Sequence, residues 1–116
     1  MTMSAEPQTL MWSRAQMYFD AKDYAGAARV LAELLEQVPE QLSVRMLLAR
    51  SYFHSAQLRR AEEQLREIVE REPVEAYAHL MLGRTLQRQS RGEEAARHLR
   101  LAAVLDPELA PEHAPE

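Results

Sequence analysis

Apolar residues recur along the chain at intervals of three and four, which is the spacing of one face of an α-helix. One such stretch runs from Leu42 to about Gln57, and a second runs from Leu58 to Arg71. Pro73 ends the second stretch, because its ring and its missing N–H cannot continue a helix. The whole pattern predicts six helices, near residues 8–21, 24–37, 42–55, 58–71, 76–89 and 92–105, and no strand.

The helical stretches repeat with a fixed period. Pro39, Pro73 and Pro107 stand 34 residues apart. A period of this length indicates stacked repeats, in which each unit packs only on its neighbours. Four further columns of residues keep the same interval: Ala15, Ala49 and Gly83; Tyr18, Tyr52 and Leu86; Ala27, Ala61 and Ala95; Leu31, Leu65 and Leu99.

Small residues mark the places where two helices of one unit should approach closely. Ala49 lies on the first helix of the second unit and Ala61 lies on the second helix, while the short connection near residues 55–57 makes the two helices antiparallel. Gly83 occupies the position of Ala49 in the next unit, where glycine costs a helix about 1 kcal/mol. We therefore interpret Gly83 as a contact with a neighbouring helix.

These motifs resemble the tetratricopeptide repeat, whose pattern is W-x2-L-G-x2-Y, then A-x3-F, then P. The third unit matches it with Leu82-Gly83-x2-Leu86, Ala95-x3-Leu99 and Pro107. The resemblance implies an all-α fold, a right-handed α–α superhelix of six helices in three antiparallel pairs. Its three repeats would span residues 8–41, 42–75 and 76–109.

The chain departs from the family pattern at two places. The tryptophan position holds Met11, Arg45 and His79, and Arg14 replaces the leucine of the first unit. We expect both departures to weaken packing locally, with Arg14 on the solvated side of a terminal helix.

Both ends of the chain are predicted to be disordered, residues 1–7 as a leader and the proline-rich residues 110–116 as a tail. Arrays of this family usually finish with an additional polar helix, and we see none here. Apolar residues of the last helix should therefore face a missing fourth unit, covered by the folded-back tail or by a second copy in a homodimer. The candidates for this oligomerisation contact are Leu99, Ala102 and Leu105.

The resemblance also implies a binding groove, because the first helix of each family unit lines the concave surface where ligands commonly lie. Polar residues flank a strip of aromatic and thioether side chains there, and arginines make its C-terminal half basic. Whether Phe19 and Phe53 belong to the groove or to the core stays open. The candidate partner-binding residues are Trp12, Gln16, Phe19, Met46, Arg50, Phe53, His54, Tyr77, Leu80, Arg84 and Arg88.

One ligand mode of the family is not expected. Some members grip the C-terminal carboxylate of chaperones with lysine, asparagine and arginine at set points of the groove. The matching positions hold no positive charge here; they are Trp12, Gln16, Leu47, Tyr77 and Met81.

Composition excludes several other classes of function. The net charge of −4 and the pI near 5.6 argue against nucleic-acid binding, which needs a basic stripe. The absence of cysteine excludes disulfides and thiolate sites, and no apolar run is long enough for a bilayer. The first residues do not form a secretory signal, so we expect a cytoplasmic protein. Arginine outnumbers lysine 13 to 1, a bias typical of GC-rich bacterial genomes.

No catalytic or metal motif is found. His54, His79, His98 and His113 are at least 15 residues apart in sequence, and we interpret them as solvated helix residues rather than metal ligands. The pairs Glu62-Glu63 and Glu93-Glu94 are interpreted as acids in the first turn of a helix. We expect neither an enzyme nor a bound cofactor.

The leading hypothesis is an adaptor that holds a peptide or helix of another protein in its groove. Its alternatives are a structural module that self-assembles through the last helix, and a chaperone of the bacterial secretion type. The sequence does not name the partner.

Overall fold

The structure is a computed structural model that describes residues 6–110. Its helices are α1 (Gln8–Asp20), α2 (Tyr24–Gln37), α3 (Leu42–His54), α4 (Leu58–Arg71), α5 (Ala76–Arg88) and α6 (Gly92–Leu105), followed by the 3-10 helix η1 (Pro107–Leu109). No strand occurs within residues 6–110. The six predicted helices are confirmed; three ranges agree fully, and α1, α3 and α5 each end one residue before the predicted position.

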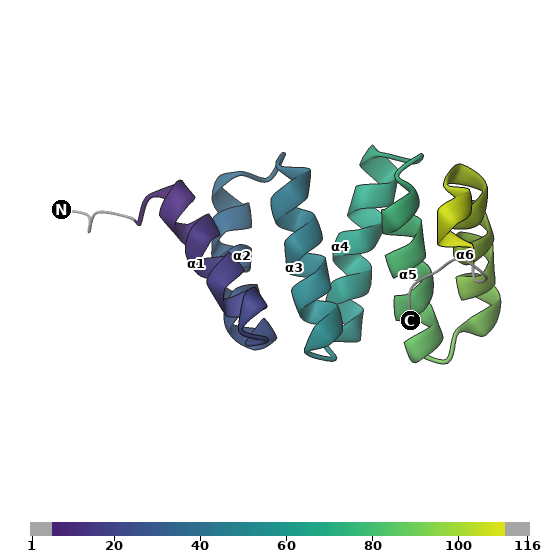
Figure 1. The fold of residues 1–116 in the computed structure, drawn as a ribbon, viewed down its shortest axis with the longest axis horizontal. Coiled ribbons are helices and arrows are strands. Elements are labelled where there is room, and N and C mark those ends of the chain that lie inside the picture. Colours follow the sequence, from purple (N-terminus) through teal and green to yellow (C-terminus); the bar gives the residue numbers. More distant parts are fainter. Residues whose placement is uncertain (1–5, 111–116) are drawn as a thin grey trace.

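The helices stand side by side in one row, with each helix packed on the next one along the chain (Figure 1). The closest pairs are α1 with α2, α3 with α4 and α5 with α6, and α3 also contacts α5 directly. The first helices of the units, α1, α3 and α5, therefore form one continuous face. We call it the first-helix face. Within the described part of the chain, no helix is both long and apolar enough to cross a membrane.

The predicted small-residue positions lie at the centre of each helix pair. Ala15, Ala49, Ala27, Ala61 and Ala95 are all completely buried. Large apolar side chains then fill the space between units and form two clusters, one centred on α1 to α3 and one on α3 to α6. The packing that the sequence columns predicted is confirmed.

The connection inside each unit has the same backbone geometry. Lys22, Ala56 and Ser90 have φ angles of 64°, 62° and 63°, and they stand 34 residues apart. In the second unit, the N–H of Gln57 bonds to the carbonyl oxygen of Tyr52 at 2.8 Å, and that of Ala56 bonds to Phe53 at 3.1 Å. This is the Schellman ending, which usually places glycine at the left-handed position. None of the three units has glycine at this position.

The last helix differs from its prediction. Ala102 is completely buried, while Leu99 and Leu105 are half-buried, so these residues do not form an open face for a fourth unit. η1 folds back to contact both α5 and α6. The exposed apolar residues of α6 are instead Leu101 and Val104. The predicted leader and tail lie largely outside the described residues.

Candidate functional site

Two hollows open between successive units on the first-helix side of the molecule. The first, of about 370 Å³, has an apolar lining of Trp12, Leu34, Val38 and Val44, with neutral polar residues around it. The second, of about 240 Å³, lies between α3 and α5 and has Leu42, Met46, Ile68 and Tyr77 in its lining. Both hollows present apolar lining residues with polar groups at their edges, which is typical of ligand-binding pockets.

The two hollows are equivalent positions of the repeat. Every residue that lines the second hollow lies 34 residues after a residue that lines the first. Trp12 corresponds to Met46, and Leu34 corresponds to Ile68. The second hollow differs in charge, because Glu72 and Glu75 replace Val38 and Gln41 at its rim. A ligand that spans both hollows would therefore meet a neutral rim and then an acidic one.

An aromatic cluster lies near the C-terminal ends of α1 and α3. The ring of His54 stacks on Tyr24 at a centroid distance of 4.7 Å and meets the edge of Phe19 at 5.9 Å. The guanidinium of Arg50 lies 4.8 Å from the centre of the Phe19 ring. At this distance the cation is attracted by the ring face. Tyr24 was not predicted as a member of the site, because no other unit has an aromatic residue at its position.

Phe53 lies in a similar environment one unit later. The guanidinium of Arg88 is 4.8 Å from the centre of its ring, and Arg88 Nη1 donates a hydrogen bond to the Phe53 carbonyl oxygen at 3.0 Å. Both phenylalanines are half-buried and pack against the core clusters. Each ring therefore belongs partly to the core and also contacts an arginine, and its role in a binding groove stays a prediction.

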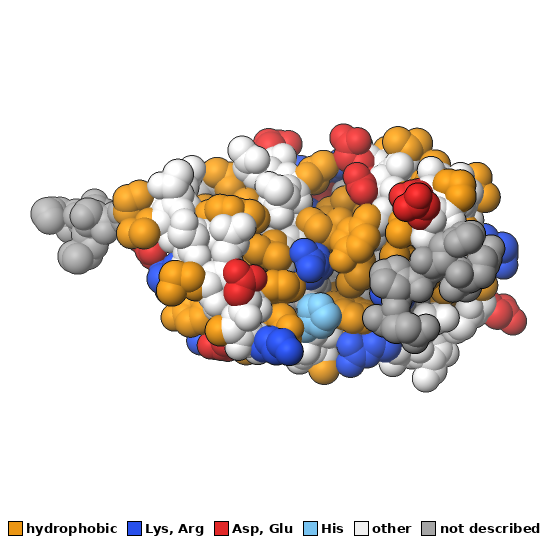
Figure 2. Space-filling view, viewed as in Figure 1, with side chains coloured by type: hydrophobic (Ala, Val, Ile, Leu, Met, Phe, Trp, Pro, Cys, Tyr) orange, Lys and Arg blue, Asp and Glu red, His pale blue; other side chains and the backbone are white. Residues whose placement is uncertain are grey.

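Arg50 and Arg88 place positive charge on these rings, and Arg84 lies one turn before Arg88 on α5. Arg50, Arg84 and Arg88 have no carboxylate within ion-pair distance in residues 6–110, whereas Arg66, Arg71 and Arg91 are all paired. The pKa of His54 is lowered. The largest cause is partial burial of its ring, and the charges of Arg50 and Arg88 add to it. Figure 2 shows basic side chains and a histidine set among hydrophobic side chains over α3 and α5.

Most of the predicted site residues lie together on the first-helix face. Trp12, Met46 and Tyr77 line the hollows, and the arginines lie near the C-terminal ends of the same helices. Gln16 is exposed on α1. The prediction for Leu80 is wrong, because its side chain is only 7% exposed and packs into the core. Leu34 and Ile68 were missed because they belong to the second helices, and Val38 because it directly follows α2; the groove pattern left these segments out.

Two of the three residues at the family's tryptophan position, Arg45 and His79, are held by hydrogen bonds, whereas Met11 packs in the core. His79 Nε2 lies 2.8 Å from the carbonyl oxygen of Pro73, and Arg45 Nη2 bonds to the carbonyl oxygen of Pro39 at 3.1 Å. His79 Nδ1 lies 3.2 Å from His98 Nδ1, as Arg45 Nη1 lies 2.7 Å from Gln64 Oε1 one unit earlier. These are matching pairs of the repeat, so polar bonds replace the packing of tryptophan.

The interpretation of all histidines as solvated is therefore wrong for His79, which is 5% exposed. Because a carbonyl oxygen can only accept, His79 Nε2 carries a proton, and the 3.2 Å contact between the two Nδ1 atoms requires that one of them donates to the other. Burial, followed by the charges of His79 and Arg66, lowers the pKa of His98. His113 lies outside the described residues.

Four charged side chains link the second and third units through a closed set of ion pairs. Glu62 and Glu94 each accept from both Arg66 and Arg91, at N–O distances of 2.6 to 2.9 Å. Burial by itself raises the pKa of Glu62, but hydrogen bonds from Gln89, Arg66 and Arg91 outweigh it, so the pKa is lowered. Glu62 is 13% exposed and lies beyond the first turn of α4, which corrects its interpretation as a solvated first-turn acid.

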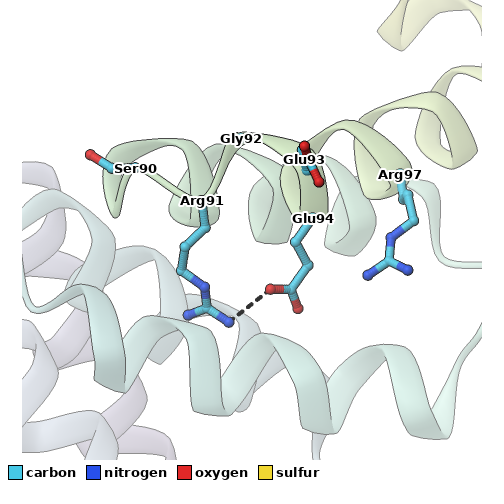
Figure 3. A pocket seen from close by; sticks show the side chains of 6 residues that line it. All are labelled: Ser90, Arg91, Gly92, Glu93, Glu94 and Arg97. Atoms are coloured by element: carbon cyan, nitrogen blue, oxygen red, sulfur yellow. Dashed lines mark hydrogen bonds and ion pairs between the residues drawn. The ribbon is translucent and has the colours of Figure 1, made fainter.

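A wider depression of about 530 Å³ adjoins this network at the start of α6 (Figure 3). Its lining is polar or charged, and Arg91 and Glu94 within it already neutralise each other. Its lining offers no apolar anchor. Residues 6–110 also contain no group of three or more His, Cys, Asp or Glu that could hold a metal ion.

Comparison with known families agrees with this geometry. The profile of the tetratricopeptide repeat matches residues 18–84, which is more than half of the chain. The chain belongs to the tetratricopeptide repeat family. Membership supports a role as a protein–protein interaction module. No curated protein matches the sequence significantly.

Several solved structures share the fold. A point mutant of MamA is 20% identical with a TM-score of 0.82, covering 89% of this chain and 75% of that one. MamA of strain MSR-1 is also 20% identical at 0.82, covering 90% and 60%. MamA from Desulfovibrio magneticus RS-1 is 23% identical at 0.77, covering 84% and 55%. At such identities the likeness shows the fold alone, the right-handed tetratricopeptide superhelix that the sequence predicted.

Proposed function

We propose that the chain is an adaptor that holds a segment of a partner protein on the first-helix face. It acts by binding a partner, which is the role that membership of the tetratricopeptide repeat family supports. The observation that carries this proposal is the pair of equivalent hollows, together with arginines toward the other end of the same helices that have no ion pair within residues 6–110. A cytoplasmic location and a bacterial source stay predictions from the composition.

The hollows define the apolar part of the ligand. The hollows lie one unit apart, which is two packed helices along the row, so their spacing exceeds the roughly 8–10 Å between adjacent helices. We therefore expect two apolar side chains separated by more than about three extended residues, one above Trp12 and one between Met46 and Tyr77. Such large, partly buried side chains are the usual anchors of binding energy.

The charges define the polar part of the ligand. Arg50, Arg84 and Arg88 favour carboxylate groups, which arginine binds with two parallel hydrogen bonds. They lie near the C-terminal ends of α3 and α5, whereas Tyr77 and the acidic rim lie near the N-terminal end of α5. A partner segment with acidic residues toward the arginines thus has a preferred orientation.

Selection from a displayed peptide library against the intact protein tests the proposal. We expect enriched peptides to combine two spaced apolar residues with acidic ones. Arg50→Glu combined with Arg84→Glu should weaken the selected peptide about 30-fold or more, the equivalent of a hot spot near 2 kcal/mol. The matched control is Arg29→Glu with Arg59→Glu, exposed positions on the second helices that make the same change in charge. Equal losses in both variants, or no loss in either, would contradict the proposal.

A further inference from the structure

His54 lies between two phenylalanine rings, and each of these rings carries an arginine. The ring of His54 meets Phe19 at a centroid distance of 5.9 Å and Phe53 at 5.4 Å, both in a T-shaped arrangement. The Arg50 guanidinium lies 4.8 Å from the centre of the Phe19 ring, and the Arg88 guanidinium lies 4.8 Å from that of Phe53. The two cations therefore stand on the rings that flank the histidine. We call Arg50, His54 and Arg88 the basic cluster.

The positive charge of the basic cluster is not compensated within residues 6–110. Neither arginine has an ion pair there, and Asp20, the exposed residue 34 positions before His54, is paired with neither. The buried Nε of Arg50 has no hydrogen-bond partner in the described part of the chain, and Arg88 uses one N–H on the Phe53 carbonyl oxygen. Because a guanidinium has five N–H donors, the cluster keeps donors for a ligand.

His54 adds a group that can gain a proton near neutral pH. The helices around it contribute Phe19 from α1, Tyr24 from α2, which stacks on the ring at 4.7 Å, and Arg88 from α5. The charges of Arg88 and of Arg50 on α3 both disfavour the protonated ring. A carboxylate bound between the cations would offset these charges and accept a hydrogen bond from the imidazolium. Binding of an anion therefore favours protonation of the histidine.

We propose that the basic cluster is an anion site, which binds a carboxylate of the partner segment and takes up a proton on His54 as it does so. The site deepens the adaptor proposal and rests on it for the source of the carboxylate. In the free protein the pKa of His54 lies below its ordinary value, and a bound anion raises it. The protonated protein therefore binds the anion more tightly, and affinity increases as the pH falls from about 8 to about 6, through the ordinary histidine range.

Calorimetry with the acidic peptide selected from the library tests the coupling in the intact protein. The wild type should bind this peptide about threefold or more tightly at pH 6 than at pH 8. His54→Gln changes an exposed side chain, so it should leave the fold intact and abolish this pH dependence. The matched control is His98→Gln, which removes the other histidine of lowered pKa and should keep the dependence. A wild type without the dependence, or a dependence that persists in His54→Gln, overturns the proposal.

Sulfate tests the basic cluster without any peptide, so a failure of the adaptor proposal does not affect this experiment. Sulfate keeps its full charge throughout the histidine range, and the proton taken up must then go to the protein. Titration of the His54 ring protons by NMR should show a higher pKa in sodium sulfate than in sodium chloride of equal ionic strength. Arg88→Gln should reduce this rise, whereas Arg100→Gln, an exposed position on α6, should not. A His54 pKa that sulfate leaves unchanged overturns the anion site.

Discussion

Gly83 of α5 lies directly against Leu99 of α6. A Cβ atom added to Gly83 would stand 2.6 Å from Leu99 Cδ2 and 3.2 Å from the backbone oxygen of Ala95. Units one and two carry alanine at this position, beside Leu31 and Leu65. The third helix pair is therefore packed more closely around glycine, which explains why a residue unfavourable in helices is present here.

This contact predicts a change of sign in a double-mutant experiment. Gly83→Ala should destabilise the protein by about 1 kcal/mol, because overpacking of about 1–3 kcal/mol exceeds the gain in helix propensity. With Leu99→Ala in the background the clash is removed, and the same substitution should stabilise by a fraction of 1 kcal/mol. Urea unfolding of the four proteins measures both effects. A stabilising Gly83→Ala in the wild type would contradict the close packing.

Much of this fold could be predicted because the repeat supplies three independent copies of each position. The columns of alanine and leucine predicted the helix pairs. The prolines predicted where the second helices end, and all helix ends agree to within one residue. The interpretation of Gly83 as a helix contact is confirmed by Leu99. The register also placed Trp12 and Met46 at equivalent positions of the first-helix face, and Tyr77 lines the same hollow as Met46.

The sequence predictions failed where one unit differs from the other two, or where residues from two different positions of the repeat contact each other. His79 and His98 are 19 residues apart, and their contact becomes visible only beside the equivalent pair Arg45 and Gln64. Leu80 was assigned to the groove from its register, although its side chain is buried. Ala102 is small enough for the surrounding structure to bury it without a fourth unit.

The left-handed positions between the helices of each unit predict a stabilising substitution. Ala56 has a φ of 62°, where an L-residue is strained by about 1–2 kcal/mol. Ala56→Gly should raise the free energy of unfolding by about 0.5–1 kcal/mol, after the greater entropy of the unfolded glycine is subtracted. Ala32→Gly, inside α2, is the control and should lower it by about 1 kcal/mol. Thermal unfolding distinguishes these opposite signs.

The ion pairs between the second and third units predict a difference between neighbouring glutamates. Glu62→Gln removes the charge that Arg66 and Arg91 share and should destabilise the protein by about 1 kcal/mol. Glu63→Gln, at the exposed next position, should change stability by less than about 0.5 kcal/mol. Denaturation at low salt measures this difference, which high salt should reduce. Equal effects would mean that the network contributes little.

The histidines predict a loss of stability in mild acid. The pKa values of His54 and His98 are lowered in the folded protein, so the unfolded chain binds protons more readily. Stability should be constant above about pH 6.5, the ordinary histidine value, and fall as the pH drops below it. His98→Gln places the residue of the second unit at this position and should reduce the slope. An unchanged slope below pH 6.5 would show that His98 is not responsible.

The emission of Trp12 gives the most direct test of binding on the first-helix face. Trp12 is the single tryptophan of the chain and lines the first hollow. Titration with the selected peptide should change its fluorescence saturably, with the dissociation constant that calorimetry gives, and Arg50→Glu with Arg84→Glu should weaken both signals together. Tight binding by calorimetry without any change in Trp12 emission would contradict the proposed site.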